Sequence, residues 1–155
     1  MFLSRYIVSM RLLFKLSFLI STLVFGGCSN EIPTITDSSL PEDFSYDIVV
    51  DKFIKWNNTF EVEEHDYYVY FFSPTCSHCN KLKNFIIPII KEKGNIYLVE
   101  SCAEIKFVKD TSMVLGVDNI SDFGIIGYPT LVRISDKKVD SYFIGVQSIK
   151  NELTN

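Results

Sequence analysis

One stretch, residues 66–83, sets the strongest limits on how this chain can fold. Residues 67–72 are aromatic or β-branched with almost no polar alternation, as expected of a strand buried on both faces of a sheet. Pro74 breaks this strand, and Cys76 and Cys79 follow at the start of an amphipathic helical pattern. The stretch therefore predicts a buried strand that leads directly into a helix, with both thiols at the junction.

The spacing of Cys76 and Cys79 indicates thiol chemistry. Cysteines three positions apart can close a disulfide with each other. A helix N-terminus gathers unpaired N–H groups and a partial positive charge, so it favours a thiolate over a thiol. The alternative is half of a zinc site, but no second CxxC and no downstream HxxxH accompanies the pair. We therefore expect no metal and no cofactor other than the redox-active Cys76–Cys79 disulfide.

The first 27 residues have the composition of an export signal. They contain Arg5, Arg11 and Lys15 and no acid, and then an apolar run over 16–25 and two glycines. A membrane span needs about 20 apolar residues, so a retained transmembrane anchor is the weaker alternative. We therefore expect residues 1–27 to be a signal peptide that is removed.

Cys28 follows two small residues at the end of this signal. The sequence from Phe25 to Cys28 resembles the lipobox of bacterial lipoproteins, although Phe25 stands where those proteins usually have leucine. The resemblance implies cleavage before Cys28 and lipidation of its thiol, so that the protein is anchored at the extracytoplasmic face of a bacterial membrane. The alternative is a freely secreted protein in which Cys28 has no role.

Residues 28–43 read as the lipidated cysteine and a flexible tether, because residues 29–43 are rich in Ser, Thr, Pro and acids without an apolar period. Loss of residues 1–27 removes three of the 15 Lys and Arg residues and none of the 19 acids, so the net charge becomes −7. Nucleic acid is therefore not expected as a partner.

Residues 44–155 predict one α/β domain. We expect an amphipathic helix over 44–58, the buried strand over 67–72, and a helix that continues through 93, is kinked at Pro88 and ends at Gly94. A strand over 96–99 and a helix from the capping box at 101–104 towards 109 follow. Strands over 130–134 and 139–144, joined by a hairpin at 136–138, and a short helix over 148–153 complete the pattern. This order predicts parallel and antiparallel pairs in one sheet.

With these elements assigned, residues 44–155 resemble thioredoxin-fold thiol–disulfide oxidoreductases. CSHC at the start of a helix after a buried strand carries the resemblance, together with residues 123–130, FGIIGYPT, which are similar to the segment that holds the family's cis-proline. The resemblance implies a central mixed sheet flanked by helices, with Pro129 cis and against the dithiol. It also implies that Tyr128 and Pro129 bind the substrate peptide. An ordinary trans proline that opens a strand is the alternative.

The resemblance also implies roles for individual side chains. Cys76 would be the nucleophile that forms a mixed disulfide, and Cys79 would resolve it. His78, if protonated near the pair, would favour the Cys76 thiolate and make the protein a stronger oxidant. Histidine at this position resembles the disulfide isomerases and oxidases, whereas reducing thioredoxins have proline there. A surface histidine without effect is the alternative.

Several positions depart from the family pattern. Thr75 replaces the usual aromatic residue before the first cysteine, and Tyr70 replaces a buried acid that assists proton transfer at the second. A phenol has a reference pKa near 10, so we expect slower resolution or proton transfer through another group, such as water or a lysine. Pro88 lies twelve residues after Cys76, whereas the family's helix proline usually lies eight after it.

The span between the dithiol helix and Pro129 is longer than in minimal thioredoxins, with the insert around residues 100–118. Cys102 lies in this insert, at the start of the predicted capping-box helix, and is a possible third, activated thiol near the site. The alternative is a cysteine that serves only as a small apolar side chain.

Three functions remain open on the sequence. The preferred one is an exported, membrane-anchored enzyme that exchanges disulfides with the thiols of exported proteins, tilted towards oxidation or isomerisation, with a membrane or extracytoplasmic redox partner. The second is a reductase supplied with electrons by a membrane thiol carrier. The third is a non-catalytic accessory module for export of a secreted peptide such as a bacteriocin, which should tolerate loss of both Cys76 and Cys79.

Overall fold

The computed structural model describes residues 43–155, and the predictions for the signal peptide, for Cys28 and for the tether up to residue 42 lie outside this range. The elements in chain order are η1 (Tyr46–Lys52), η2 (Trp56–Asn58), β1 (Asp66–Phe72), α2 (Ser77–Lys93), β2 (Ile96–Glu100), η3 (Thr111–Met113), β3 (Thr130–Ser135), β4 (Lys138–Ile144) and α3 (Gly145–Thr154). Among these described elements, no helix is both long and apolar enough to cross a membrane.

The four strands form one mixed sheet with the order β2-β1-β3-β4. β1 is parallel to β2 and antiparallel to β3, and β3 is antiparallel to β4. The parallel connection from β1 to β2 passes through α2, and the β3–β4 hairpin turns at Asp136 and Lys137, both of which have positive φ. This βαβ unit followed by a ββα unit is the predicted thioredoxin-like architecture.

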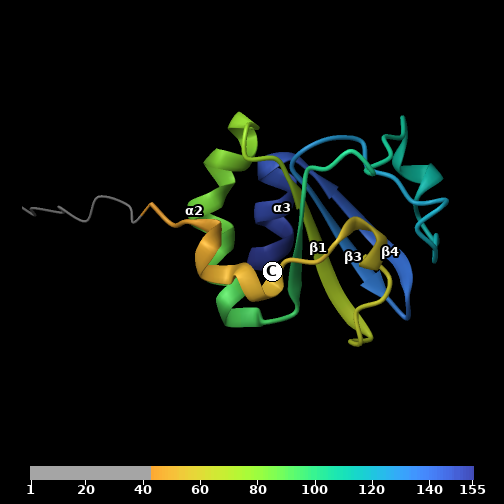
Figure 1. The fold of residues 1–155 in the computed structure, drawn as a ribbon, viewed down its shortest axis with the longest axis horizontal. Helices are drawn as coiled ribbons and strands as arrows, with labels where there is room; N and C mark the ends of the chain where they lie inside the picture. The colour runs from red at the N-terminus through yellow and green to blue at the C-terminus, as the bar shows by residue number, and fades with distance from the viewer. Residues whose placement is uncertain (1–42) are drawn as a thin grey trace, which may run out of the picture. The chain divides into compact units, whose positions relative to one another are not determined.

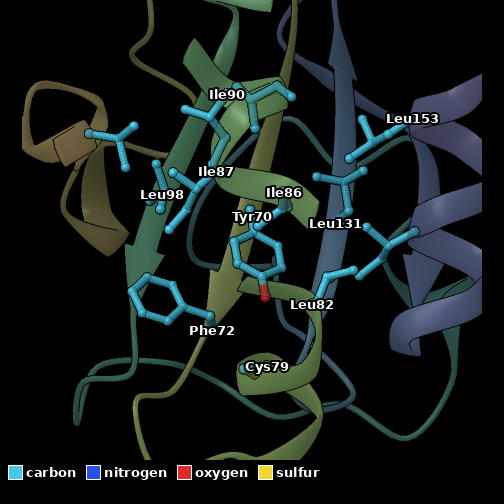
Figure 2. Packing of buried hydrophobic residues seen from close by; sticks show 13 residues of the cluster. Tyr70, Phe72, Cys79, Leu82, Ile86, Ile87, Ile90, Leu98, Leu131 and Leu153 are labelled. Carbon is cyan, nitrogen blue, oxygen red and sulfur yellow. The ribbon is translucent and has the colours of Figure 1, made fainter. Parts of the chain in front are cut away.

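The buried strand β1 divides the core into two clusters because successive side chains point to opposite faces. Tyr70 and Phe72 pack on the face that α2 and α3 cover (Figures 1 and 2). Tyr67, Val69 and Phe71 pack on the opposite face against Trp56 of η2 and against Phe123 and Ile125, which lie between η3 and β3. Both α-helices therefore lie on one face, and η2 together with the segment between residues 105 and 125 covers the other.

The helix predicted over 44–58 is wrong. The chain forms the two short 3₁₀ helices η1 and η2, and between them Phe53 makes a parallel bridge to Leu98 of β2. The reason is that this segment crosses the edge of the sheet, with Val49 buried in one core cluster and Trp56 in the other. One helix could not reach both faces, so sheet contacts override the local periodicity.

α2 agrees with its predicted bounds. It runs from Ser77 to Lys93 through Pro88, and Gly94 ends it with φ of 74°, the left-handed conformation that glycine adopts readily. Its buried face consists of Cys79, Leu82, Ile86, Ile87 and Ile90. α2 therefore packs along the β1 side chains, and its first turn lies at the end of β1 (Figure 2).

Candidate active site

Cys76 is the N-cap of α2. β1 ends at Phe72, and a turn closed by a hydrogen bond of 3.1 Å from Cys76 N–H to the Ser73 carbonyl brings the chain into the helix. The Cys76 sulfur accepts a hydrogen bond from the backbone N–H of Cys79 over 3.4 Å. This sulfur therefore occupies the position where an N-cap side chain satisfies an otherwise free helix donor.

These contacts lower the pKa of Cys76. Burial alone would raise that pKa, but hydrogen bonds from the Cys79 thiol and from the backbone N–H groups of Cys79 and His78 outweigh it. All of these donors stabilise the negative sulfur. Cys76 is also half-buried rather than enclosed, so its thiolate is open to an incoming sulfur.

Cys79 has the opposite environment. Its side chain is completely buried in the core beneath the first turn of α2. Burial raises the pKa of Cys79 to about 12, because the apolar surroundings disfavour the thiolate. Both cysteines are free thiols in this structure, so the pair is in its dithiol form. The two sulfurs thus differ in access and in acidity within one helical turn.

The segment before β3 forms the other wall of the site. The Tyr128–Pro129 peptide bond is cis, and the Cys76 thiol donates to the Tyr128 carbonyl over 3.6 Å. The Pro129 carbonyl accepts from Gly145 N–H at 2.9 Å, which ties this segment to the start of α3. The fold therefore brings residue 128 to residue 76 across 52 positions of sequence.

An apolar edge extends from this wall. The Phe107 side chain is 58% exposed, and its ring meets the Tyr128 ring edge-on at a centroid distance of 5.8 Å. The insert is fixed there by a parallel bridge between Phe107 and Ile125. An exposed aromatic side chain therefore lies next to the residue whose carbonyl contacts Cys76.

His78 is exposed at the surface of α2. Its backbone N–H, rather than its imidazole, contributes to the lowered pKa of Cys76. Among the described residues, no contact joins the His78 imidazole to the Cys76 sulfur, so the influence of the ring on the thiolate stays a prediction. Thr75 is likewise exposed, and its hydroxyl pairs with that of Ser73 at 3.1 Å.

The capping-box helix predicted at 101–109 is wrong. Ser101 N–H instead donates to the Phe72 carbonyl at 2.8 Å, and the chain continues as turns to an isolated bridge at Phe107. Cys102 is exposed and its pKa is raised, first by partial burial and then by Glu104. Cys102 therefore lacks the helix start that was expected to activate its thiol, although the negative charge of its thiolate raises the pKa of Tyr128.

Two residues of the site were not predicted. Tyr46 of η1 lies in the core cluster of Cys79, and Phe107 borders Tyr128. Neither has a local sequence pattern that marks it, because both reach the site through tertiary contacts. Among the described residues, no group of three or more His, Cys, Asp or Glu side chains is arranged to hold a metal ion.

The chain was compared with family models, curated proteins and solved structures. No model of a known family matches the chain, and no curated protein matches it. Similar solved structures include mitochondrial thioredoxin 3 from Saccharomyces cerevisiae in its oxidised form, with 15% identity over 65% of this chain and 89% of that one at a TM-score of 0.42. Plasmodium falciparum thioredoxin has 11% identity over 66% and 96%, at a TM-score of 0.43. Fasciola hepatica thioredoxin has 20% identity over 58% and 77%, at a TM-score of 0.39. The thioredoxin-like fold is assigned here on the chain's own strand order and pairing.

Proposed function

We propose that this protein is a thiol–disulfide oxidoreductase that works through Cys76 and Cys79. The Cys76 thiolate attacks a substrate disulfide, forms a mixed disulfide and releases one substrate thiol. Cys79 then attacks the Cys76 sulfur, which closes the Cys76–Cys79 disulfide and releases the second substrate thiol. The reverse sequence oxidises a substrate dithiol and leaves both cysteines reduced.

One observation carries this proposal, namely the pairing of two thiols whose environments differ in opposite senses. The sulfur of Cys76 accepts the Cys79 N–H at a helix N-terminus, and its pKa is lowered. The Cys79 thiol is fully buried, and its pKa is raised to about 12. Such a pair gives one accessible nucleophile and one protected resolving thiol, and purely structural cysteines do not need this division.

The wall opposite the dithiol supports a peptide as the substrate. The Tyr128 carbonyl faces Cys76, and Tyr128 N–H has no hydrogen-bond partner within residues 43–155. An extended peptide can pair with such backbone groups as an added strand while its own sulfur meets Cys76. Phe107, exposed beside Tyr128, supplies apolar contact to the neighbouring substrate residues.

The cellular setting forms part of the proposal. The export signal over 1–27 and the lipobox-like Cys28 support an enzyme held at the extracytoplasmic face of a bacterial membrane, where its substrates are exported proteins and a membrane or extracytoplasmic partner restores its redox state. The lowered pKa of Cys76 supports the tilt towards oxidation, because a stabilised thiolate makes the reduced form more stable.

The test traps the substrate on Cys76. In cells, a Cys79→Ser variant should accumulate mixed disulfides that a thiol reductant releases, and a Cys76→Ser variant is the matched control that should capture none. Equal capture by both variants contradicts the proposal. A glutathione titration of the wild-type dithiol then gives the direction, because an oxidase needs a reduction potential well above about −270 mV, the value typical of thioredoxin. A potential at or below that value assigns the reductase function instead.

A further inference from the structure

Two buried tyrosine hydroxyls lie in the core beside the resolving thiol. Tyr70 is completely buried, and its hydroxyl has no hydrogen-bond partner within residues 43–155. The hydroxyl of Tyr46 is also enclosed and equally without a partner. Buried hydroxyls are normally paired, because an unmet donor loses its water without compensation. Two such groups in one cluster with Cys79 therefore need an explanation.

Stacked rings fix the Tyr70 hydroxyl near Cys79. The Tyr70 ring is parallel to that of Phe72 within 1° at 5.7 Å, and Tyr46 stacks on Phe72 at 4.1 Å. Figure 2 shows the Tyr70 hydroxyl directed towards the turn of α2 that carries Cys79. The hydroxyl also acts on the thiol, since it opposes the burial that raises the pKa of Cys79. The donor is therefore held in place before any thiolate forms.

No charged group is available to take this role. The buried polar side chains of the described residues, apart from tyrosines and cysteines, are Thr59 and Thr130, so no carboxylate, ammonium or imidazole is buried. The titratable groups that face Cys79 are Cys76 at the start of α2, Tyr70 on β1, Tyr46 on η1 and Tyr128 in the segment before β3. The other neighbouring elements contribute only apolar side chains to the cluster, namely Leu98 from β2, Leu131 from β3, and Ile149 and Leu153 from α3.

We propose that Tyr70, supported by Tyr46, is a positioning residue that donates a hydrogen bond to the Cys79 thiolate whenever the Cys76–Cys79 disulfide closes or opens. This inference rests on the proposed function, because it concerns the resolving step of the same site. The two hydroxyls have no partner while Cys79 is a neutral thiol, and the Tyr70 hydroxyl gains one when Cys79 becomes a thiolate. The hydroxyl of Tyr46 lies beside that of Tyr70 and, by donating to the Tyr70 oxygen, leaves the Tyr70 hydrogen free for Cys79.

The step balances with the phenol protonated throughout. During closure, the Cys79 thiol loses its proton, its sulfur attacks the Cys76 sulfur, and the bond between Cys76 and the substrate sulfur breaks. The substrate sulfur leaves with the electron pair and takes up a proton, so one thiol is oxidised and one is formed. During opening, Cys79 is the leaving thiolate. The same donor therefore assists both directions of exchange, which is why this inference does not depend on the direction of electron flow.

The test isolates the resolving step in the full chain with Cys28 and Cys102 replaced by serine. Reaction with 5,5′-dithiobis(2-nitrobenzoate) places a thionitrobenzoate group on Cys76, and attack by Cys79 then releases a second coloured thiolate. Tyr70→Phe should slow this second release about tenfold and move its pH midpoint upwards by about one unit, because a hydrogen bond to a charged sulfur is lost. The first release, which reports Cys76 alone, should be unchanged.

The controls separate this role from a structural one. Tyr46→Phe should give a smaller effect of the same sign. Tyr67→Phe removes a buried hydroxyl from the same strand but on the opposite face, where it donates to the Thr59 carbonyl at 2.9 Å, and should leave the second release unchanged. An unaltered rate and midpoint in Tyr70→Phe overturns the inference. A Tyr70→Phe chain that loses its fold also overturns it, because the hydroxyl would then support the core. If the wild-type chain shows no second release, the proposed function itself fails.

Discussion

The backbone N–H of Cys79 donates to the sulfur of Cys76 over 3.4 Å, while the sulfur of Cys79 is itself completely buried. One residue thus supplies both a donor that stabilises the nucleophile and the thiol that resolves its product. The local geometry of a helix start makes this possible, because the first N–H groups of the helix have no partner within it. The acidity of Cys76 therefore depends on the Cys79 thiol and on the backbone donors of Cys79 and His78.

His78 provides a direct test of this dependence. His78→Pro removes a backbone donor in the first turn of α2, a position that proline tolerates, whereas His78→Ala keeps the donor and removes the imidazole. We expect His78→Pro to raise the pKa of Cys76 by about one unit and to lower the reduction potential by about 30 mV. His78→Ala should shift the pKa of Cys76 and the reduction potential by only a small fraction of the changes expected for His78→Pro. Thiolate absorbance at about 240 nm, followed against pH, measures the pKa of Cys76. A glutathione titration measures the reduction potential.

The opposite result would identify the ring as the active group. If His78→Ala shifts both quantities and His78→Pro adds nothing further, protonated imidazole rather than the backbone controls the thiolate, as the sequence resemblance implied.

The raised pKa of Cys79 predicts that the reduced protein loses stability in mild alkali. The unfolded chain releases this proton near pH 8.5, whereas the folded chain keeps it up to a pKa of about 12. Above about pH 8.5 the folded state therefore binds more protons, and its free energy of unfolding falls with rising pH by at most about 1.4 kcal/mol per unit. Urea unfolding of the reduced wild type and of Cys79→Ala from about pH 7.5 to 9.5, below the reference pKa of tyrosine, should show a shallower slope in the variant.

Cys76→Ala serves as the control with the other sign. The lowered pKa of Cys76 contributes stability that is present above the ordinary thiol pKa and is lost as the pH falls through its folded value. Its removal should therefore make the alkaline loss steeper. Parallel slopes in wild type and Cys79→Ala would contradict the buried, neutral assignment of this thiol.

The elements around the dithiol were predictable because their signals are local. An unbroken aromatic run gave β1, helical spacing with a terminal Gly94 gave α2, and paired turn residues gave the β3–β4 hairpin. The helices predicted at 44–58 and 101–109 failed because both segments lie against the sheet, where Phe53 bridges Leu98 and Ser101 N–H bonds to Phe72. Both segments have a helical pattern in sequence, but their contacts with the sheet outweigh this local preference for a helix.

The candidate site divides in the same way. CxxC spacing places both cysteines at the start of α2, and this needs only local sequence. Tyr46 and Phe107 both lie 30 or more positions from Cys76 in the sequence. Tyr46 joins the site by stacking on Phe72, and Phe107 joins it by its contact with Tyr128. Such contacts depend on how the insert and η1 fold over the sheet, and single-sequence patterns do not encode them.

Gly124 is expected to hold the insert close to the β3 side of the site. A Cβ at this position would lie 2.6 Å from Cγ1 of Val108 and 3.0 Å from the Lys106 carbonyl oxygen. Gly124→Ala should therefore lower the free energy of unfolding by about 1–3 kcal/mol, as overpacking does elsewhere. Gly127→Ala is the matched control, because a Cβ there meets nothing within 4 Å. Urea unfolding of both variants checks this, and equal stability of the two would show that the insert moves freely.

Phe107 is expected to contribute to peptide binding without taking part in the exchange. Its exposed ring borders Tyr128, whose carbonyl contacts the Cys76 thiol, so an extended substrate at Cys76 would cover it. Loss of that contact in Phe107→Ala should raise KM for a disulfide-containing peptide with flanking apolar residues by about 5–30-fold, which corresponds to about 1–2 kcal/mol of buried aromatic surface. kcat should stay within about twofold, because the contact does not change between the bound and transition states.

Met113→Ala is the matched control for this last prediction. Met113 is 59% exposed, close to the 58% of Phe107, but it belongs to η3, which leads into Val114 and Gly116 beside the start of β4, at the far end of the sheet from the dithiol. Its KM should equal that of the wild type, and neither variant should alter the rate with a small disulfide such as oxidised glutathione. If Phe107→Ala slows reaction with the small disulfide as strongly as with the peptide, the ring acts on the dithiol rather than on substrate binding.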